Sequence, residues 1–102
     1  MSNFQHFSVN QLIQLAQTNS DIQIVDIRDA TSFASGHVQG AVNLNNENLA
    51  NYVAEADMDK PIIVICYHGI SSQGAAQYLV EQGFDDVYSL DGGYQAWHEA
   101  NA

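Results

Sequence analysis

Cys66 is the only cysteine in the chain, and its surroundings make it the residue best placed to do chemistry. It ends the apolar run at residues 61–66 and is followed by a loop, after which a helix is expected. The loop residues are Tyr67, His68, Gly69, Ile70, Ser71 and Ser72. A thiol at such a strand end faces backbone N–H groups and the positive end of the helix, which favour a thiolate near neutral pH. The sequence therefore predicts a nucleophilic cysteine in a loop that can cradle an anion.

Three residues of this loop are of types that suit a loop that binds an anion. Gly69 permits the backbone φ values that a tight loop demands. Ser71 and Ser72 can cap the following helix or donate hydroxyl hydrogen bonds to a bound anion. The alternative is that Cys66 is a buried packing residue, as many lone cysteines are. The order strand, cysteine, loop, helix favours the nucleophile over this alternative.

The elements that must position the loop can be read from the pattern of apolar residues. Strands are predicted at residues 4–7, 21–27, 40–44, 62–65 and 86–90. Helices are predicted from a capping box at Ser8 and Gln11, over residues 47–56, over 72–82 with a stop at Gly83, and over 94–100, with one short turn at 31–35. This alternation implies an α/β fold with a mainly parallel sheet and helices on both faces. Ligands of such sheets bind beyond the carboxyl ends of the strands, which is where Cys66 lies.

Length and composition limit the architecture. A chain of 102 residues predicts one domain, over residues 1–102, because domains average roughly 100 to 200 residues. The hydrophobic share of 46% is ordinary for a folded core, and no apolar run approaches the roughly 18 residues of a membrane helix. Residues 1–6 show neither the basic nor the apolar region of a signal peptide, so a cytoplasmic location is expected.

Charge and cysteine count exclude several classes of function. Arg28 and Lys60 are the only strong cations against 12 carboxylates, which gives a formal net charge of -10. Such a chain is a poor partner for nucleic acids and for anionic membranes, both of which bind through Lys and Arg. With one cysteine, an internal disulfide and a four-cysteine zinc site are impossible. A small anionic substrate would need a local positive pocket to overcome the global repulsion.

Four segments together resemble a known family. Residues 66–72 resemble the active-site loop of the single-domain rhodaneses, the thiosulfate sulfurtransferases of the GlpE type. Residues 25–28 and 33–44 resemble the first signature block of that family, and residues 91–97 resemble its C-terminal block. The matches follow the family's order and span residues 25–97. The resemblance implies a single rhodanese-like domain around a five-stranded, mainly parallel sheet.

The resemblance also implies a reaction. Cys66 would take the outer sulfur of thiosulfate as a persulfide, sulfite would leave, and cyanide, a small thiol or a dithiol would remove the sulfur. A thioredoxin-like protein is a further acceptor of the kind the family implies. Residues 67–72 would supply a cradle whose N–H groups stabilise the persulfide electrostatically. No metal or organic cofactor is required.

Other polar residues of the signature blocks are predicted to be structural. Arg28 is expected to form an ion pair with Asp26, although a guanidinium could also attract anions. His37 is expected to hydrogen bond to backbone and fix a turn, and Trp97 to pack in the core. His68 could add positive charge to the loop or simply face solvent. No partner is identified for His6 and His98.

The loop departs from the commoner family pattern, and two rival functions remain. Gln73 stands where a basic residue is often found, and Ile70 is apolar, so backbone dipoles, hydroxyls and His68 must attract the donor. A cysteine-dependent phosphatase would need an arginine six residues after the cysteine, where this chain has Ser72. The other rival is a non-enzymatic rhodanese-like module that binds a protein or carries sulfur, and the intact Cys66 argues against it.

Overall fold

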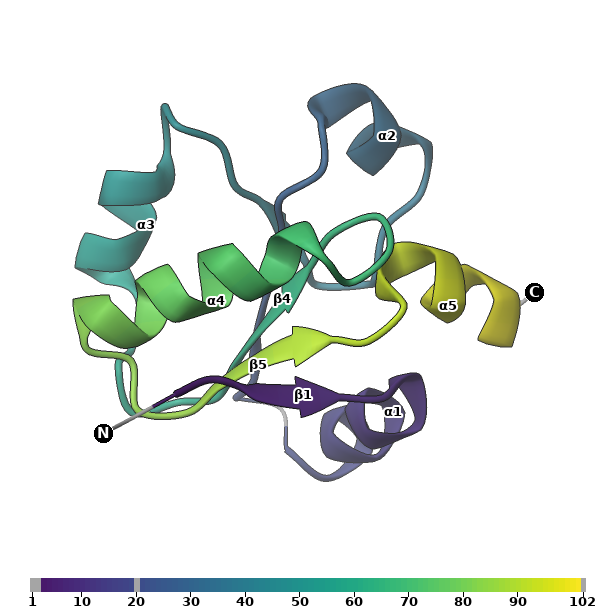
Figure 1. Ribbon diagram of the computed structural model, residues 1–102, viewed down its shortest axis with the longest axis horizontal. Helices are drawn as coiled ribbons and strands as arrows, with labels where there is room; N and C mark the ends of the chain where they lie inside the picture. The colour runs from purple at the N-terminus through teal and green to yellow at the C-terminus, as the bar shows by residue number, and fades with distance from the viewer. Residues whose placement is uncertain (1–2, 20, 102) are drawn as a thin grey trace.

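A computed structural model describes residues 3–19 and 21–101 of the chain. Strands and helices alternate along it (Figure 1): β1 (Gln5–Phe7), α1 (Val9–Thr18), β2 (Gln23–Asp26), α2 (Ala30–Ser35), β3 (Val42–Asn43), α3 (Leu49–Glu55), β4 (Ile62–Ile65), α4 (Ser71–Gln82), β5 (Val87–Leu90) and α5 (Gly93–Ala100). The predicted α/β class is confirmed, and each predicted segment overlaps an observed element. No helix of these described ranges is long and apolar enough to cross a membrane.

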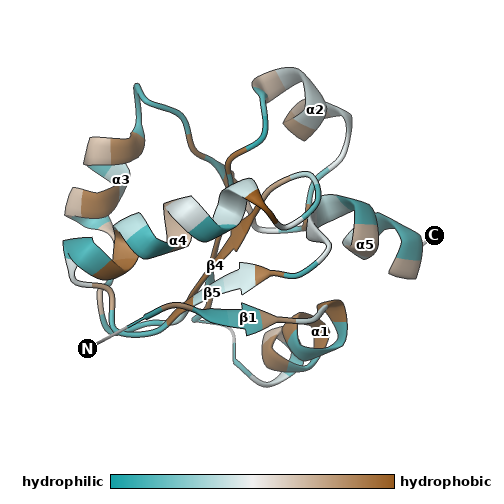
Figure 2. Ribbon diagram, viewed as in Figure 1, coloured by the Kyte–Doolittle hydropathy of each residue, from teal (hydrophilic) through white to brown (hydrophobic). Residues whose placement is uncertain are grey.

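All strand pairs of the sheet are parallel, in the order β1-β5-β4-β2-β3. The central strand β4 is buried along its whole length and stands out as an apolar segment in Figure 2. One core lies between the sheet and helices α3 and α4, around Val64 and Leu79. The other lies on the opposite face against α1 and α5, around Ile63 and Leu12. Because the strands are parallel, the residues that follow β2, β3 and β4 meet at one edge of the sheet.

Local signals account for the ends of the helices. The Ser8 side chain accepts a hydrogen bond from the Gln11 amide at 3.1 Å, and Gln11 Oε1 accepts one from the Ser8 amide at 2.8 Å, which confirms the capping box before α1. Gly83 ends α4 in the left-handed conformation at φ 111, also as predicted. The strand predicted over residues 40–44 is reduced to β3, because Gly40 turns the chain at φ 87 before pairing begins at Val42.

Candidate active site

Cys66 follows β4 directly, and the residue is only 3% exposed. The Gly69 amide donates a hydrogen bond to Cys66 Sγ at 3.1 Å, so the loop folds back over the sulfur. The thiol in turn donates to Ser72 Oγ at 3.2 Å, and Ser72 lies in the first turn of α4. The strand end, the loop and the helix start therefore converge on one sulfur atom.

The pKa of the Cys66 thiol is lowered from its ordinary value. Burial acts against this, because it disfavours the charged thiolate and raises the pKa. Hydrogen bonds from the Ser72 hydroxyl and from the backbone amides of Ser72, Gly69 and His68 favour the thiolate and outweigh burial. The loop thus raises the fraction of nucleophilic thiolate near neutral pH.

The curl of the loop depends on Gly69 and on a side chain that reaches back from α4. Gly69 has φ 86, and a Cβ on it would lie 2.7 Å from the Gly92 amide nitrogen. Gln73 Nε2 donates to the Gly69 carbonyl at 2.8 Å. Gln73 therefore does more than leave the loop without a cation: it holds the carbonyl of the residue whose amide bonds to the sulfur.

Helix α5 supports the start of the loop from the other side. The amide of Tyr94 donates to the Cys66 carbonyl at 2.8 Å, and the amide of Gln95 donates to the Tyr67 carbonyl at 3.2 Å. Gly93, at φ 61, is so close that a Cβ would lie 2.5 Å from the Cys66 carbonyl oxygen. The turn at residues 91–93 thus fixes the loop after Cys66 as well as starting a helix.

The side chains of the cradle residues divide between those facing the sulfur and those facing solvent. Tyr67 and Ile70 are 44% and 75% exposed, and His68 and Ser71 are exposed too. Ser72 is fully buried and turned toward the sulfur. The helix N-cap is Ile70 with no side-chain capping bond, so the suggestion that Ser71 or Ser72 caps α4 is wrong. Both serines lie inside the first turn of α4, past the N-cap position, and the Ser72 hydroxyl contacts the sulfur instead.

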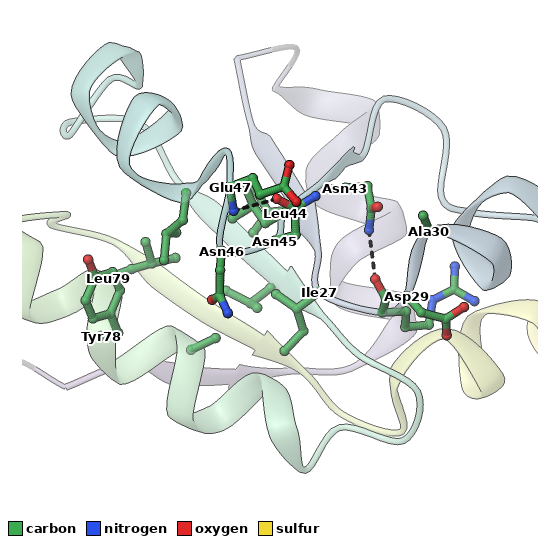
Figure 3. Close-up of a pocket in the computed structure, with 15 residues that line it drawn as sticks. Ile27, Asp29, Ala30, Asn43, Leu44, Asn45, Asn46, Glu47, Tyr78 and Leu79 are labelled. Atoms are coloured by element: carbon green, nitrogen blue, oxygen red, sulfur yellow. Dashed lines mark hydrogen bonds between the residues drawn. The ribbon is translucent and has the colours of Figure 1, made fainter.

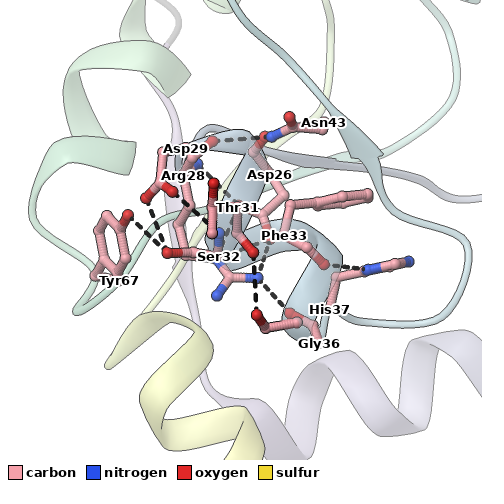
Figure 4. A network of polar contacts seen from close by, with 11 residues as sticks. Asp26, Arg28, Asp29, Thr31, Ser32, Phe33, Gly36, His37, Asn43 and Tyr67 are labelled. Carbon is pink, nitrogen blue, oxygen red and sulfur yellow. Dashed lines mark hydrogen bonds and ion pairs between the residues drawn. The ribbon is translucent and has the colours of Figure 1, made fainter.

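Arg28 is held in a polar network beside the site (Figure 4). Its guanidinium, in a residue only 6% exposed, donates to Asp26 Oδ2 at 2.8 Å and to the Gly36 carbonyl at 2.7 Å, and lies 4.0 Å from the centre of the Tyr94 ring. The predicted ion pair with Asp26 is confirmed. Arg28 is consequently committed to structure, since its charge is already neutralised by a buried carboxylate.

Other predicted structural roles also hold. His37 Nδ1 lies 2.7 Å from the Phe33 carbonyl oxygen, and the two rings stack at 3.8 Å (Figure 4). Trp97 packs against the core on the α1 and α5 face. In the ranges that the structure describes, no cluster of three or more His, Cys, Asp or Glu side chains could hold a metal ion.

Two contacts of the site region were missed by sequence reasoning. Ser89 of β5 is fully buried, and its Oγ lies 2.7 Å from Ser72 Oγ. The signal in the sequence was a serine within an otherwise apolar strand. His6 Nδ1 lies 2.8 Å from Asp91 Oδ1, next to the turn that carries α5. Since these two residues are 85 positions apart, no local pattern indicates the pair.

A cavity of about 660 Å³ lies at the same edge of the sheet, beside β2 and β3 (Figure 3). Ile27 and Leu79 give it apolar walls, and Asp29 and Glu47 add carboxylates. No residue of the range 66–72 lines it. The cavity is therefore lined by other residues than the loop that surrounds the thiol.

Comparison with known proteins decides the family. The model of the rhodanese-like domain matches residues 8–100. The chain belongs to the rhodanese-like family. A rhodanese-like relative from Shewanella oneidensis, named thiosulfate sulfurtransferase GlpE, is 70% identical over 102 residues, which cover 100% of both chains. A relative of the same name from Pseudoalteromonas translucida is 53% identical over 97 residues, covering 95% of this chain and 91% of its own length.

A solved rhodanese-like structure supports the fold. The solution structure of the rhodanese-like domain of an Anabaena protein superimposes with a TM-score of 0.84 at 23% identity, covering 100% of this chain and 77% of that chain. The resemblance drawn from residues 25–97 is thus confirmed at the level of family and fold.

Proposed function

We propose that this rhodanese-like chain is a thiosulfate sulfurtransferase that carries sulfur as a persulfide on Cys66. The observation that carries the proposal is that the buried Cys66 sulfur accepts a hydrogen bond from the Gly69 amide, in a loop that joins a strand to a helix. Relatives that are 70% and 53% identical to this chain over the aligned residues carry names that point to the same reaction. Residues 67–72 form the cradle, through their backbone amides and the Ser72 hydroxyl.

The first half of the reaction charges the cysteine. The Cys66 thiolate attacks the outer sulfur of thiosulfate, and a bond forms between that sulfur and Sγ. The bond between the two sulfurs of thiosulfate breaks, and sulfite leaves with its electron pair. The product is a persulfide whose outer sulfur bears the negative charge. The N–H groups of Gly69, His68 and Ser72, which favour the thiolate, are positioned to stabilise that charge as well.

The second half of the reaction removes the sulfur from Cys66. Cyanide, a small thiol or a dithiol attacks the outer sulfur, the S–S bond of the persulfide breaks, and the electron pair returns to Sγ as thiolate. A thioredoxin-like protein is the protein acceptor we propose, because its dithiol is a nucleophile of this class. The exposed side chains of Tyr67 and Ile70 leave the loop open to an acceptor of that size.

The test separates an enzyme from a binding or carrier module. Purified protein treated with thiosulfate should gain the mass of one sulfur atom, and cyanide should release it as thiocyanate. Cys66→Ser, which has nearly the same size, should abolish both while leaving the thermal unfolding transition in place. Ser35→Ala, on the exposed end of α2, is the matched control and should retain both.

The kinetic pattern gives a second criterion. Because sulfite leaves before the acceptor reacts, double-reciprocal plots against thiosulfate at several acceptor concentrations should be parallel. Retained turnover in Cys66→Ser would overturn the persulfide mechanism. Mass gain without turnover would identify a sulfur carrier instead.

A further inference from the structure

Three buried atoms behind the loop are joined in sequence by two hydrogen bonds. Cys66 Sγ lies 3.2 Å from Ser72 Oγ, which lies 2.7 Å from Ser89 Oγ. Both serines are 0% exposed. Ser89 reaches this place because β5 pairs with β4, where it lies opposite Val64, two residues before the cysteine. The chain of atoms therefore links β4, the first turn of α4 and β5.

The two hydroxyls have few choices of partner. Across residues 3–19 and 21–101, the two hydroxyls hydrogen bond to one another, Ser72 Oγ accepts from the Cys66 thiol, and neither hydroxyl has another partner. A serine in a helix often donates instead to a backbone carbonyl of the preceding turn, and Ser72 of α4 does not do so here. Two hydrogen-bond positions must thus accommodate every proton on the three atoms.

Counting protons shows which state of the sulfur these positions suit. With a thiol, S–H and two O–H groups compete for two positions, and one buried donor is left without an acceptor. With a thiolate, Ser89 donates to Ser72, Ser72 donates to the sulfur, and every proton is used. A persulfide also has no proton on Sγ, so the same arrangement serves it. An unpaired buried donor is unfavourable, so the count favours the sulfur without its proton.

We propose that Ser89 is a positioning residue, which donates to Ser72 and thereby directs the Ser72 proton at the Cys66 sulfur throughout the reaction. The inference rests on the proposed function for the persulfide stage, and on the geometry alone for the thiolate. Ser89 touches neither sulfur nor substrate. It acts by occupying the lone pair of Ser72, which polarises the O–H that points at the sulfur.

Other titratable groups surround the sulfur, and they are common to every variant used below. His68 and Tyr67 belong to the loop, and the Arg28 guanidinium lies 5.8 Å from the Tyr67 ring while paired with Asp26. At the end of β5, Asp91 is paired with His6. Because none of these residues is changed, a shift between variants reports on the hydroxyls.

The experiment measures the pH of half-maximal alkylation of Cys66 by iodoacetamide, which needs no sulfur transfer. Removing a hydrogen bond to a thiolate in Ser72→Ala should raise this pH by about 1 unit. Ser89→Ala should raise it by about 0.3 unit, the smaller effect of lost polarisation. In a Ser72→Ala background, Ser89→Ala should cause no further shift, because the intermediary is gone. Ser35→Ala should leave the midpoint unchanged.

A pair of variants of equal shape separates the hydroxyl from packing. Ser89→Thr keeps a hydroxyl and Ser89→Val replaces it with a methyl group, so both crowd the site equally. Threonine should retain the alkylation midpoint of the unchanged chain more closely than valine, even if both lower the unfolding temperature. Equal midpoints for the two would overturn the proposal, as would a Ser89→Ala shift that persists without the Ser72 hydroxyl. If the midpoints behave as expected but thiosulfate adds no sulfur, the proposed reaction fails and the role of Ser89 toward the thiolate stands.

Discussion

Gly93→Ala is the substitution for which the structure gives the sharpest expectation. Gly93 begins α5 with φ 61, where an L-residue is strained. An added Cβ would lie 2.5 Å from the Cys66 oxygen, 2.6 Å from the His68 nitrogen and 2.6 Å from the Tyr67 carbonyl carbon. All three are backbone atoms, so no change of rotamer relieves the contact, and either α5 or the loop must move.

Gly40→Ala provides the matched control. Gly40 has φ 87, and nothing lies within 4 Å of the position that its Cβ would occupy. Its substitution therefore costs only the left-handed conformation, about 1–2 kcal/mol, offset by about 0.4–1 kcal/mol from the stiffer unfolded chain. The net loss of unfolding free energy is about 0–1.6 kcal/mol. Gly93→Ala adds the displacement of packed backbone, about 1–3 kcal/mol, for a total of about 1–4.6 kcal/mol.

Urea unfolding of the two variants, with the slopes compared, measures this difference. The alkylation midpoint of Cys66 gives a second readout: it should rise in Gly93→Ala, because the displaced atoms begin the loop, and stay unchanged in Gly40→Ala. If the two variants lost the same unfolding free energy, the close approach of α5 to the loop would not be a constraint. The reasoning from the Cβ contacts would then be wrong.

Three further predictions concern charge. Burial, together with the hydrogen bond to Asp86 and its negative charge, raises the pKa of Tyr88 to about 12, so the unfolding free energy should fall as pH rises from about 10 to 12. Tyr88→Phe should reduce that slope in urea titrations, and the remainder comes from Tyr52, whose pKa is also raised by burial. Because the pKa of Cys66 is lowered on folding, the folded chain should alkylate at lower pH than the urea-unfolded chain, and stability should increase with pH between the two midpoints. Because the chain has a net charge of -10 and repels thiosulfate, kcat/KM for thiosulfate should increase as the ionic strength rises from very low to moderate. Gln73→Lys, which keeps a donor for the Gly69 carbonyl, should raise kcat/KM about threefold. A decrease of kcat/KM with added salt would contradict this reasoning.

Features encoded within a few residues could be predicted from the sequence. The capping box at Ser8, the stop at Gly83 and the apolar run before Cys66 are local, because the interacting groups lie within one turn or one strand of each other. The hydrogen bond from the Gly69 amide to Cys66 Sγ is local for the same reason. The Arg28 and Asp26 pair belongs here too, since its partners are only two positions apart in the sequence.

Features that depend on strand order could not be predicted this way. Parallel pairing was expected, but placing β5 between β1 and β4 is a choice among several orders that the periodicity does not distinguish. The contact of Ser89 with Ser72, and that of His6 with Asp91, exist only in that order. From the sequence, Gln73 stands out only as a residue without the expected positive charge. In the structure its side-chain amide donates a hydrogen bond to the Gly69 carbonyl, and this contact depends on how tightly the loop curls.

The support of the loop by α5 has a consequence for how the protein is made. Synthesis on the ribosome runs from the N-terminus, so Cys66 emerges well before the amides of Tyr94 and Gln95 that hold the Cys66 and Tyr67 carbonyls. A nascent chain that ends just after Cys66 carries the thiol without these restraints and without Ser89. The activated sulfur is thus assembled last, and a prematurely terminated chain keeps the cysteine but loses the chemistry.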